Sequence, residues 1–158
     1  MRWQATLVGT ALLAGCAGSD TSTIAAAPAD DAAWDSLFAP PASSTTSDTI
    51  FGVWAASDQI GIAKADARFK FEANRLTLAS RCRFDDGTVL TVGASVAARV
   101  TEDKTVILES KEVENRRGTI FCRVNASPRT LEYAVRDGRA LVHTDNPAGA
   151  FTMTKLAD

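Results

Sequence analysis

The sequence predicts an all-β protein: an antiparallel, up-and-down barrel of about eight strands that follows a signal peptide and a flexible linker. From Ile50 to the end of the chain, apolar and polar residues alternate with a period of two. Turn signals interrupt this alternation about every eight to twelve residues, and helical periodicity is almost absent. Consecutive strands joined by short turns favour a meander, and closure into a barrel would leave no exposed sheet edges.

Runs of alternating residues define the expected strands. In the run 68–72, Phe69 and Phe71 lie on one face and charged side chains lie on the other. Asp-Asp-Gly at 85–87 and Asp-Gly at 137–138 are typical of tight hairpin turns. The charged segment 111–118 is expected to be an exposed loop. About eight to ten strands are expected in total, so not every alternating run is a separate strand; the runs lie at 50–56, 60–65, 68–72, 75–84, 88–92, 95–101, 105–110, 119–125, 130–136, 139–144 and 151–156.

Residues 1–15 have the features of an export signal. Arg2 and the terminal amine precede an apolar run at 5–13, which is too short to span a bilayer as a permanent helix. The run leads into Leu13-Ala14-Gly15-Cys16, which resembles the lipobox of bacterial lipoproteins. The resemblance implies that diacylglycerol is attached to the Cys16 thiol and that the preceding residues are removed. A soluble export signal followed by an accidental cysteine is the alternative.

A lipid anchor of this kind would hold the protein on a membrane without a transmembrane helix. Each buried methylene contributes about 0.8 kcal/mol, so two acyl chains anchor a protein stably where one does not. No later apolar run approaches the roughly 18 residues of a membrane span. Ala17 follows the cysteine, and by resemblance to lipoprotein sorting it implies the outer membrane, facing the periplasm.

The segment 16–49 is expected to be a flexible, acidic linker. It is rich in Ala, Ser, Thr, Asp and Pro, and it contains five acidic side chains and no basic one. Within it, residues 30–38 are expected to form a short helix whose apolar face comprises Trp34, Leu37 and Phe38. Because so short a helix is marginal in water, its apolar face is expected to rest on the chain's own domain. Contact with a partner or membrane, and disorder, are the alternatives.

The domain at 50–158 carries 16 basic and 14 acidic side chains, which is a net excess of two positive charges. This excess is far below that of nucleic-acid-binding proteins, so no nucleic-acid partner is expected. Cys82 and Cys122 lie on the apolar faces of their strands, and outside the cytoplasm they are expected to form a disulfide. A zinc site that adds His143 is the alternative, but it lacks closely spaced ligand pairs. No metal or cofactor is expected.

Arginines flank the two cysteines with the opposite strand parity. A disulfide would therefore gather Arg81, Arg83 and Arg123 on the outer surface, near Arg116 and Arg117. Such a cluster could bind lipid phosphates or an acidic partner. The alternative is a solvated face whose charge is balanced by Glu109, Glu112 and Glu114.

The first strand of the domain carries Gly52-Val53-Trp54, which resembles the GxW signature of lipocalins and related barrels. In that family the tryptophan closes the bottom of the barrel under a basic side chain from the last strand, through a cation–π contact. The resemblance implies a small lipocalin-like barrel in which Lys155 covers Trp54. It does not settle whether the interior is open, because a small barrel can be filled by its own side chains.

No catalytic set is recognisable, so an enzyme is not expected. His143 near Asp145 and the scattered serines lack a nucleophile motif. One hypothesis is that the barrel binds a small apolar ligand or lipid in the cell envelope. The other is a protein-interaction role, such as inhibition of a hydrolase or an accessory subunit of an envelope complex. The first predicts a cavity lined by Phe69, Phe71, Leu76, Leu78, Val96, Leu131 and Tyr133.

Overall fold

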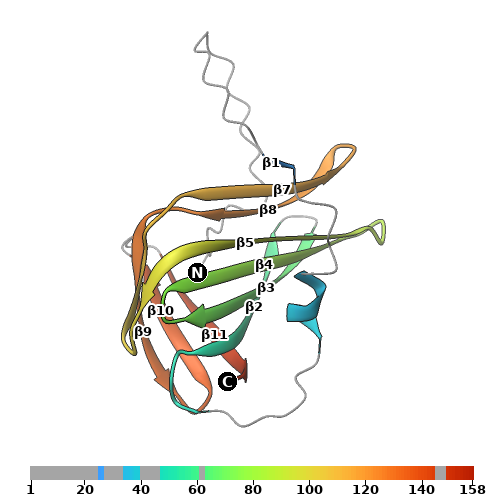
Figure 1. The fold of residues 1–158 in the computed structure, drawn as a ribbon. Coiled ribbons are helices and arrows are strands. Elements are labelled where there is room, and N and C mark those ends of the chain that lie inside the picture. The colour runs from blue at the N-terminus through green and yellow to red at the C-terminus, as the bar shows by residue number, and fades with distance from the viewer. Residues whose placement is uncertain (1–24, 27–33, 40–46, 61–62, 145–148) are drawn as a thin grey trace.

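The computed structural model describes residues 25–26, 34–39, 47–60, 63–144 and 149–158. This part of the chain is all-β apart from one helical turn, which confirms the predicted fold class (Figure 1). The elements are, in chain order, β1 (Ala25–Ala26), η1 (Ser36–Phe38), β2 (Gly52–Ile60), β3 (Ala63–Glu72), β4 (Arg75–Phe84), β5 (Val89–Val100), β6 (Lys104–Ile107), β7 (Lys111–Arg117), β8 (Ile120–Ala126), β9 (Arg129–Arg136), β10 (Arg139–Thr144) and β11 (Ala150–Ala157).

Several sequence expectations fall outside the described residues. They include the signal peptide at 1–15, the lipidated Cys16 and most of the linker. Of the helix expected at 30–38, the structure describes only the end, where Ser36–Phe38 form a 3-10 turn. No helix among the described residues is long and apolar enough to cross a membrane.

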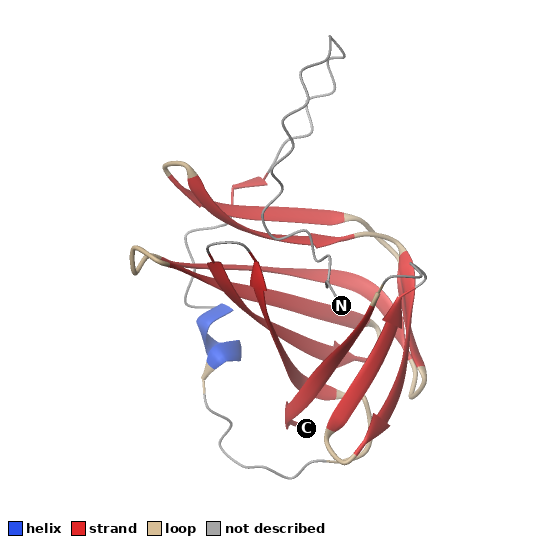
Figure 2. Ribbon diagram, turned by 180° about the vertical axis from the view of Figure 1, so that it is seen from behind, coloured by secondary structure: helices blue, strands red, loops and turns tan. Residues whose placement is uncertain are grey.

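Eight strands close into an antiparallel barrel (Figures 1 and 2). Around the barrel the order is β2-β3-β4-β5-β6-β9-β10-β11, and β11 pairs back with β2. The predicted turn at Asp137 and Gly138 joins β9 to β10, and both residues have a positive φ, as a type I′ hairpin requires. The meander is therefore sequential except at one step, from β6 to β9.

That step contains the β7–β8 hairpin, so the prediction of an exposed loop at 111–118 was wrong. β7 pairs with β8 over its whole length, and on its other side two residues pair in parallel with β1. Arg123 of β8 helps the charged strand β7 to pair, because it lies opposite Glu114 and forms ion pairs with both Glu114 and Glu112. Figures 1 and 2 show that this hairpin lies beside β5 and is not one of the strands that close the barrel.

The inward face of the long strands β3, β4 and β5 contributes side chains to two hydrophobic cores. At one end their side chains fill the barrel, together with residues from β2, β6 and β9–β11. At the other end Cys82, Leu90 and Val92 pack against Val113 and Val124 of the hairpin. The hairpin thus covers apolar wall that the barrel leaves open, which explains why strands of 10 to 12 residues remain buried along their inner side.

Candidate functional site

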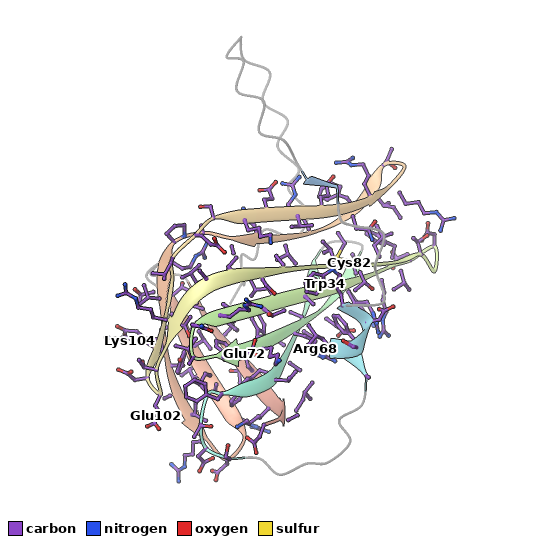
Figure 3. All side chains as sticks on the ribbon, viewed as in Figure 1. Trp34, Arg68, Glu72, Cys82, Glu102 and Lys104 are labelled. Carbon is purple, nitrogen blue, oxygen red and sulfur yellow. A yellow bond between two sulfur atoms is a disulfide. The ribbon has the colours of Figure 1, made fainter. Side chains whose placement is uncertain are left out.

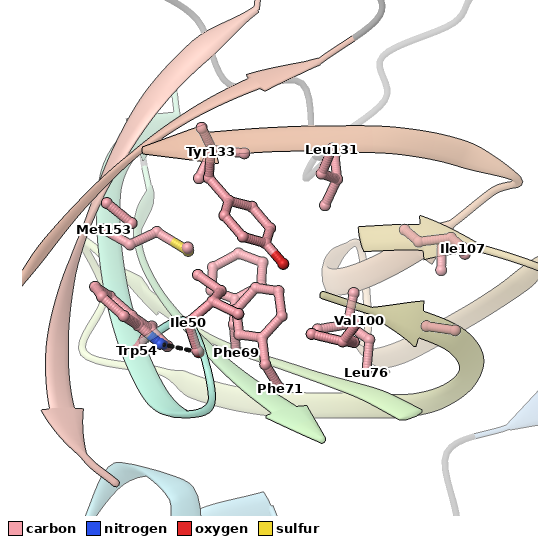
Figure 4. Packing of buried hydrophobic residues seen from close by; sticks show 14 of the residues in the cluster. Ile50, Trp54, Phe69, Phe71, Leu76, Val100, Ile107, Leu131, Tyr133 and Met153 are labelled. Atoms are coloured by element: carbon pink, nitrogen blue, oxygen red, sulfur yellow. Dashed lines mark hydrogen bonds between the residues drawn. The ribbon is translucent and has the colours of Figure 1, made fainter. Parts of the chain in front are cut away.

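The seven residues expected to line a ligand cavity lie inside the barrel, where they pack against one another. Six of them are buried in the barrel core, and Leu78 packs partly buried between the two cores. The ring centroids of Phe69 and Phe71 are 6.3 Å apart, and the Phe71 and Tyr133 centroids are 6.1 Å apart in an edge-to-face arrangement. Such spacing is that of directly packed aromatic pairs. Figure 4 shows these rings meeting Met153, Ile50 and Trp54.

Tyr133 joins the barrel core to the turn after β5. Its hydroxyl donates a hydrogen bond of 2.6 Å to the Thr101 carbonyl and lies 3.2 Å from the buried Thr105 hydroxyl. Burial of the phenol, only partly opposed by the Thr105 hydrogen bond, raises the pKa of Tyr133 to about 12. The residue therefore stays neutral and acts as a hydrogen-bonded part of the core, with no sign of an activated acid or base.

Where β2 begins and β11 ends, the structure contains the pair that the lipocalin resemblance implies. Lys155 lies opposite Trp54 in the β11–β2 ladder, and its Nζ is 5.6 Å from the centroid of the indole. The Trp54 Nε1 donates to the Ile50 carbonyl at 2.6 Å. Gly52 has a φ of 109°, and a Cβ there would lie 2.2 Å from the Ala157 carbonyl oxygen, so this position of the motif requires glycine.

Lys155 is a buried cation whose hydrogen-bonding capacity is fully used. Its Nζ donates to the carbonyls of Ser47 and Thr49, each at 3.0 Å, and contacts the carboxylate of Asp158. The hydrogen bond from Lys155 and those from Ser47 hold the pKa of Asp158 below its usual value. These contacts fasten the segment before β2 to the end of β11 and seal this end of the barrel.

Cys82 and Cys122 form the predicted disulfide, with Cα atoms 5.8 Å apart. The bond joins β4 to β8 and therefore fixes the hairpin to the barrel wall. It also excludes the zinc alternative, because both sulfur ligands are used. His143, its third member, lies exposed on β10. No group of three or more metal-ligating side chains occurs in the described ranges.

The expected gathering of arginines does not occur. Because the hairpin covers the inner face of β4, the outward side chains of β8 point away from those of β4, and Arg123 is separated from Arg81 and Arg83. Instead, each arginine meets a nearby carboxylate: Arg83 meets Asp66, and Arg123 meets Glu114. The pairing supports the balanced-surface alternative.

On the hairpin, Glu114 is the centre of this pairing. It accepts hydrogen bonds from Arg116 at 2.7 Å and from Arg123 at 2.6 Å, and both guanidinium groups also lie over the Phe121 ring. Burial favours the neutral carboxyl, but the two arginines outweigh it and lower the pKa of Glu114. The cluster is therefore self-neutralised and offers little free positive charge.

A second contact region, on the outer wall of β3–β5, receives the linker segment 34–39, which we call the strap. The Trp34 ring lies on Gly93, where a Cβ would come within 2.3 Å of it. Two guanidinium groups contact the Phe38 ring, with Arg68 Cζ 4.9 Å and Arg81 Cζ 4.2 Å from the ring centroid. Trp34 and Arg68 both lie close to η1 (Figure 3). The apolar face predicted for this segment therefore rests on its own domain.

The residues that receive the strap were not identified from the sequence. The signal was their size, since Ala79 and Gly93 are the smallest side chains on the outward faces of β4 and β5 near this point. They are paired across the two strands, and Arg68 of β3 pairs with Ala79 on the other side. Together they form a shallow floor between basic side chains.

Comparison of the chain with protein-family models, curated proteins and solved structures gives no match. The fold and the contacts described above are therefore the basis for any functional conclusion.

Proposed function

We propose that the protein is a lipid-anchored component of the bacterial cell envelope whose filled barrel is a scaffold for protein–protein interaction. An inhibitor of an envelope-attacking hydrolase and an accessory subunit of an envelope complex both fit this role. The observation that carries the proposal is the mutual packing of the seven residues that a ligand cavity would need. Filled small barrels present their function on loops and outer surfaces.

Two features of the chain support the envelope location. The residues Leu13-Ala14-Gly15-Cys16 resemble a lipobox, which would place two acyl chains on Cys16. The disulfide between Cys82 and Cys122 is of the kind that persists in oxidising compartments such as the periplasm. We propose the outer membrane, facing the periplasm, on the basis of Ala17. Binding of a small apolar ligand inside the barrel stays a prediction of the sequence.

Photo-crosslinking in the bacterium that encodes the protein tests the interaction role. A photoreactive amino acid is placed singly at outward, exposed positions of the full chain, Lys64 on β3, Arg117 at the hairpin tip and Leu141 on β10. We expect a discrete protein adduct from at least one position. If the interface is confined to one part of the surface, the other positions should give no adduct. The absence of a protein adduct from all three, with a lipid adduct in its place, would overturn the proposal.

The anchor is tested separately with labelled palmitate. We expect the full chain to incorporate the label and a Cys16→Ser variant to lose both the label and its membrane association. Equal fractionation of the two forms would refute lipid anchoring and leave the crosslinking result to stand alone.

A further inference from the structure

We propose that the outer wall of β3, β4 and β5 recognises a peptide segment that carries an aromatic side chain beside two carboxylates, and that the strap occupies this site as an internal competitor. The inference rests on the interaction role proposed above and assigns that role to one surface. A partner would bind by replacing the strap with a segment that satisfies the site more fully.

The floor of the site is shaped to receive an aromatic ring. Arg68, Ala79 and Gly93 lie in register across the three strands, and the next outward row holds Asp66, Arg81 and Thr91. Ala79 is only 2% exposed although it points outward. Trp34 lies directly on the Gly93 backbone, which no larger residue would allow. An apolar floor between basic side chains is suited to the face of an aromatic ring.

The walls of the site recognise an aromatic ring and a carboxylate together. Arg68 and Arg81 both lie within cation–π distance of the Phe38 ring, so two guanidinium groups contact one aromatic side chain. The carboxylate of Asp35 pairs with Arg81 and accepts a hydrogen bond of 3.3 Å from the Thr91 hydroxyl. The strap thus shows which chemistry the surface accepts.

One cation of the site is left without an acidic partner by the strap. Among the described residues Arg68 makes no ion pair, its Nε is buried without a hydrogen-bond partner, and its Nη1 donates only to the neighbouring Ala67 carbonyl at 3.0 Å. Burial, together with the nearby positive charges of Arg81 and Arg83, disfavours this guanidinium charge and lowers its pKa, and the carboxylate of Asp66, which opposes them, is already paired with Arg83. A segment with a second carboxylate next to its aromatic residue would supply the missing partner.

The strap holds its place by few contacts. It forms one 3-10 turn, and none of the residues of that turn is fully buried. A segment this short has little helical stability of its own. Attachment to the same chain therefore gives the strap its advantage, through a high effective concentration that a better-matched partner can overcome.

Peptide binding to the full chain in detergent tests the proposal. The site is vacated by the double substitution Trp34→Ala and Phe38→Ala, with retention of the disulfide and of the far-ultraviolet spectrum as the check on folding. The probes are a labelled peptide of residues 33–40 and the same peptide with Ala39→Asp, which adds an acid beside Phe38. We expect both to bind the vacated chain, the second about fivefold more tightly, and both to bind the unmodified chain at least about tenfold more weakly.

A matched pair of arginine variants assigns the extra affinity to Arg68. In the vacated chain, Arg68→Gln is expected to abolish the gain in affinity that the second acid gives. Arg75 lies on β4, on the same outer face of the sheet as Arg68, and Arg75→Gln is expected to leave this gain in affinity unchanged. No peptide binding to the folded, vacated chain, or an undiminished gain in the Arg68→Gln background, would overturn the proposal. Because no envelope partner is used, such a failure leaves the crosslinking test of the interaction role intact.

A fluorescence measurement on the unmodified chain avoids the vacated variant altogether. An excess of the Ala39→Asp peptide, with Phe in place of its Trp34, is expected to shift the emission of Trp34 to the red as the strap leaves, while the buried Trp54 stays unchanged. An emission spectrum that does not move at peptide concentrations that saturate the vacated chain would contradict displacement.

Discussion

Reduction of the Cys82–Cys122 disulfide shows how much the covalent link between the hairpin and the barrel contributes to the free energy of unfolding. The two cysteines are separated by 40 residues, and cross-linking a loop of this length stabilises a protein by about 4 kcal/mol in the chain-entropy model. The apolar contacts of Val113 and Val124 with Val92 remain after reduction, so the hairpin is expected to stay docked in the native state. The loss therefore arises mainly from greater freedom of the unfolded chain.

Urea unfolding with and without a reducing agent gives the magnitude. With an m-value of about 1.5 kcal/mol/M, a loss of about 4 kcal/mol lowers the midpoint by roughly 2 to 3 M. A Cys82→Ala, Cys122→Ala variant is the control, because a reducing agent should not change its midpoint. A shift of less than about 0.5 M on reduction of the unmodified protein would refute the reasoning, since it would mean that the bond does not restrain the unfolded chain.

Three further predictions concern single side chains. Tyr133→Phe should lower the free energy of unfolding by about 1 to 2 kcal/mol in urea, because the part-buried Thr101 carbonyl loses its donor and the buried Thr105 hydroxyl loses its partner. Gly93→Ala should leave the barrel folded and shift the Trp34 emission to the red, because a Cβ at this position occupies the space of the indole. The pKa of Glu114 is lower in the folded protein than in the unfolded chain. The ionised carboxylate therefore stabilises the folded state above about pH 4.5, and this contribution is lost as the pH falls through the folded-state pKa. Glu114→Gln should flatten this part of the curve of unfolding free energy against pH.

The barrel could be predicted because its strands each bury one face. The alternation of Phe69 and Phe71 with charged residues is a direct consequence of that burial, and strand parity also placed Cys82 and Cys122 on the same side. The turn at 137–138 was recognisable because few residues other than Asp-Gly adopt two consecutive positive φ angles.

The features that escaped prediction depend on contacts between distant segments. β7 has only Val113 as a strongly apolar inward residue, so its pattern resembles that of a charged loop, and its stability comes from pairing with β8. β6 pairs with β9 because the β7–β8 hairpin is left out of the barrel. No local sequence pattern indicates that these two strands will be left out. The strap site escaped notice because Ala79 and Gly93 are unremarkable in a strand until an aromatic ring covers them.

Native mass spectrometry of the full chain, extracted from membranes in detergent, tests the central claim most directly. The packed interior predicts that the mass equals that of the chain plus the lipid proposed on Cys16, and that it does not change when collisional activation strips away detergent. One additional apolar molecule per chain, released by activation at a defined energy and lost in a Phe71→Trp variant that crowds the interior, would contradict the account and restore a ligand-binding barrel.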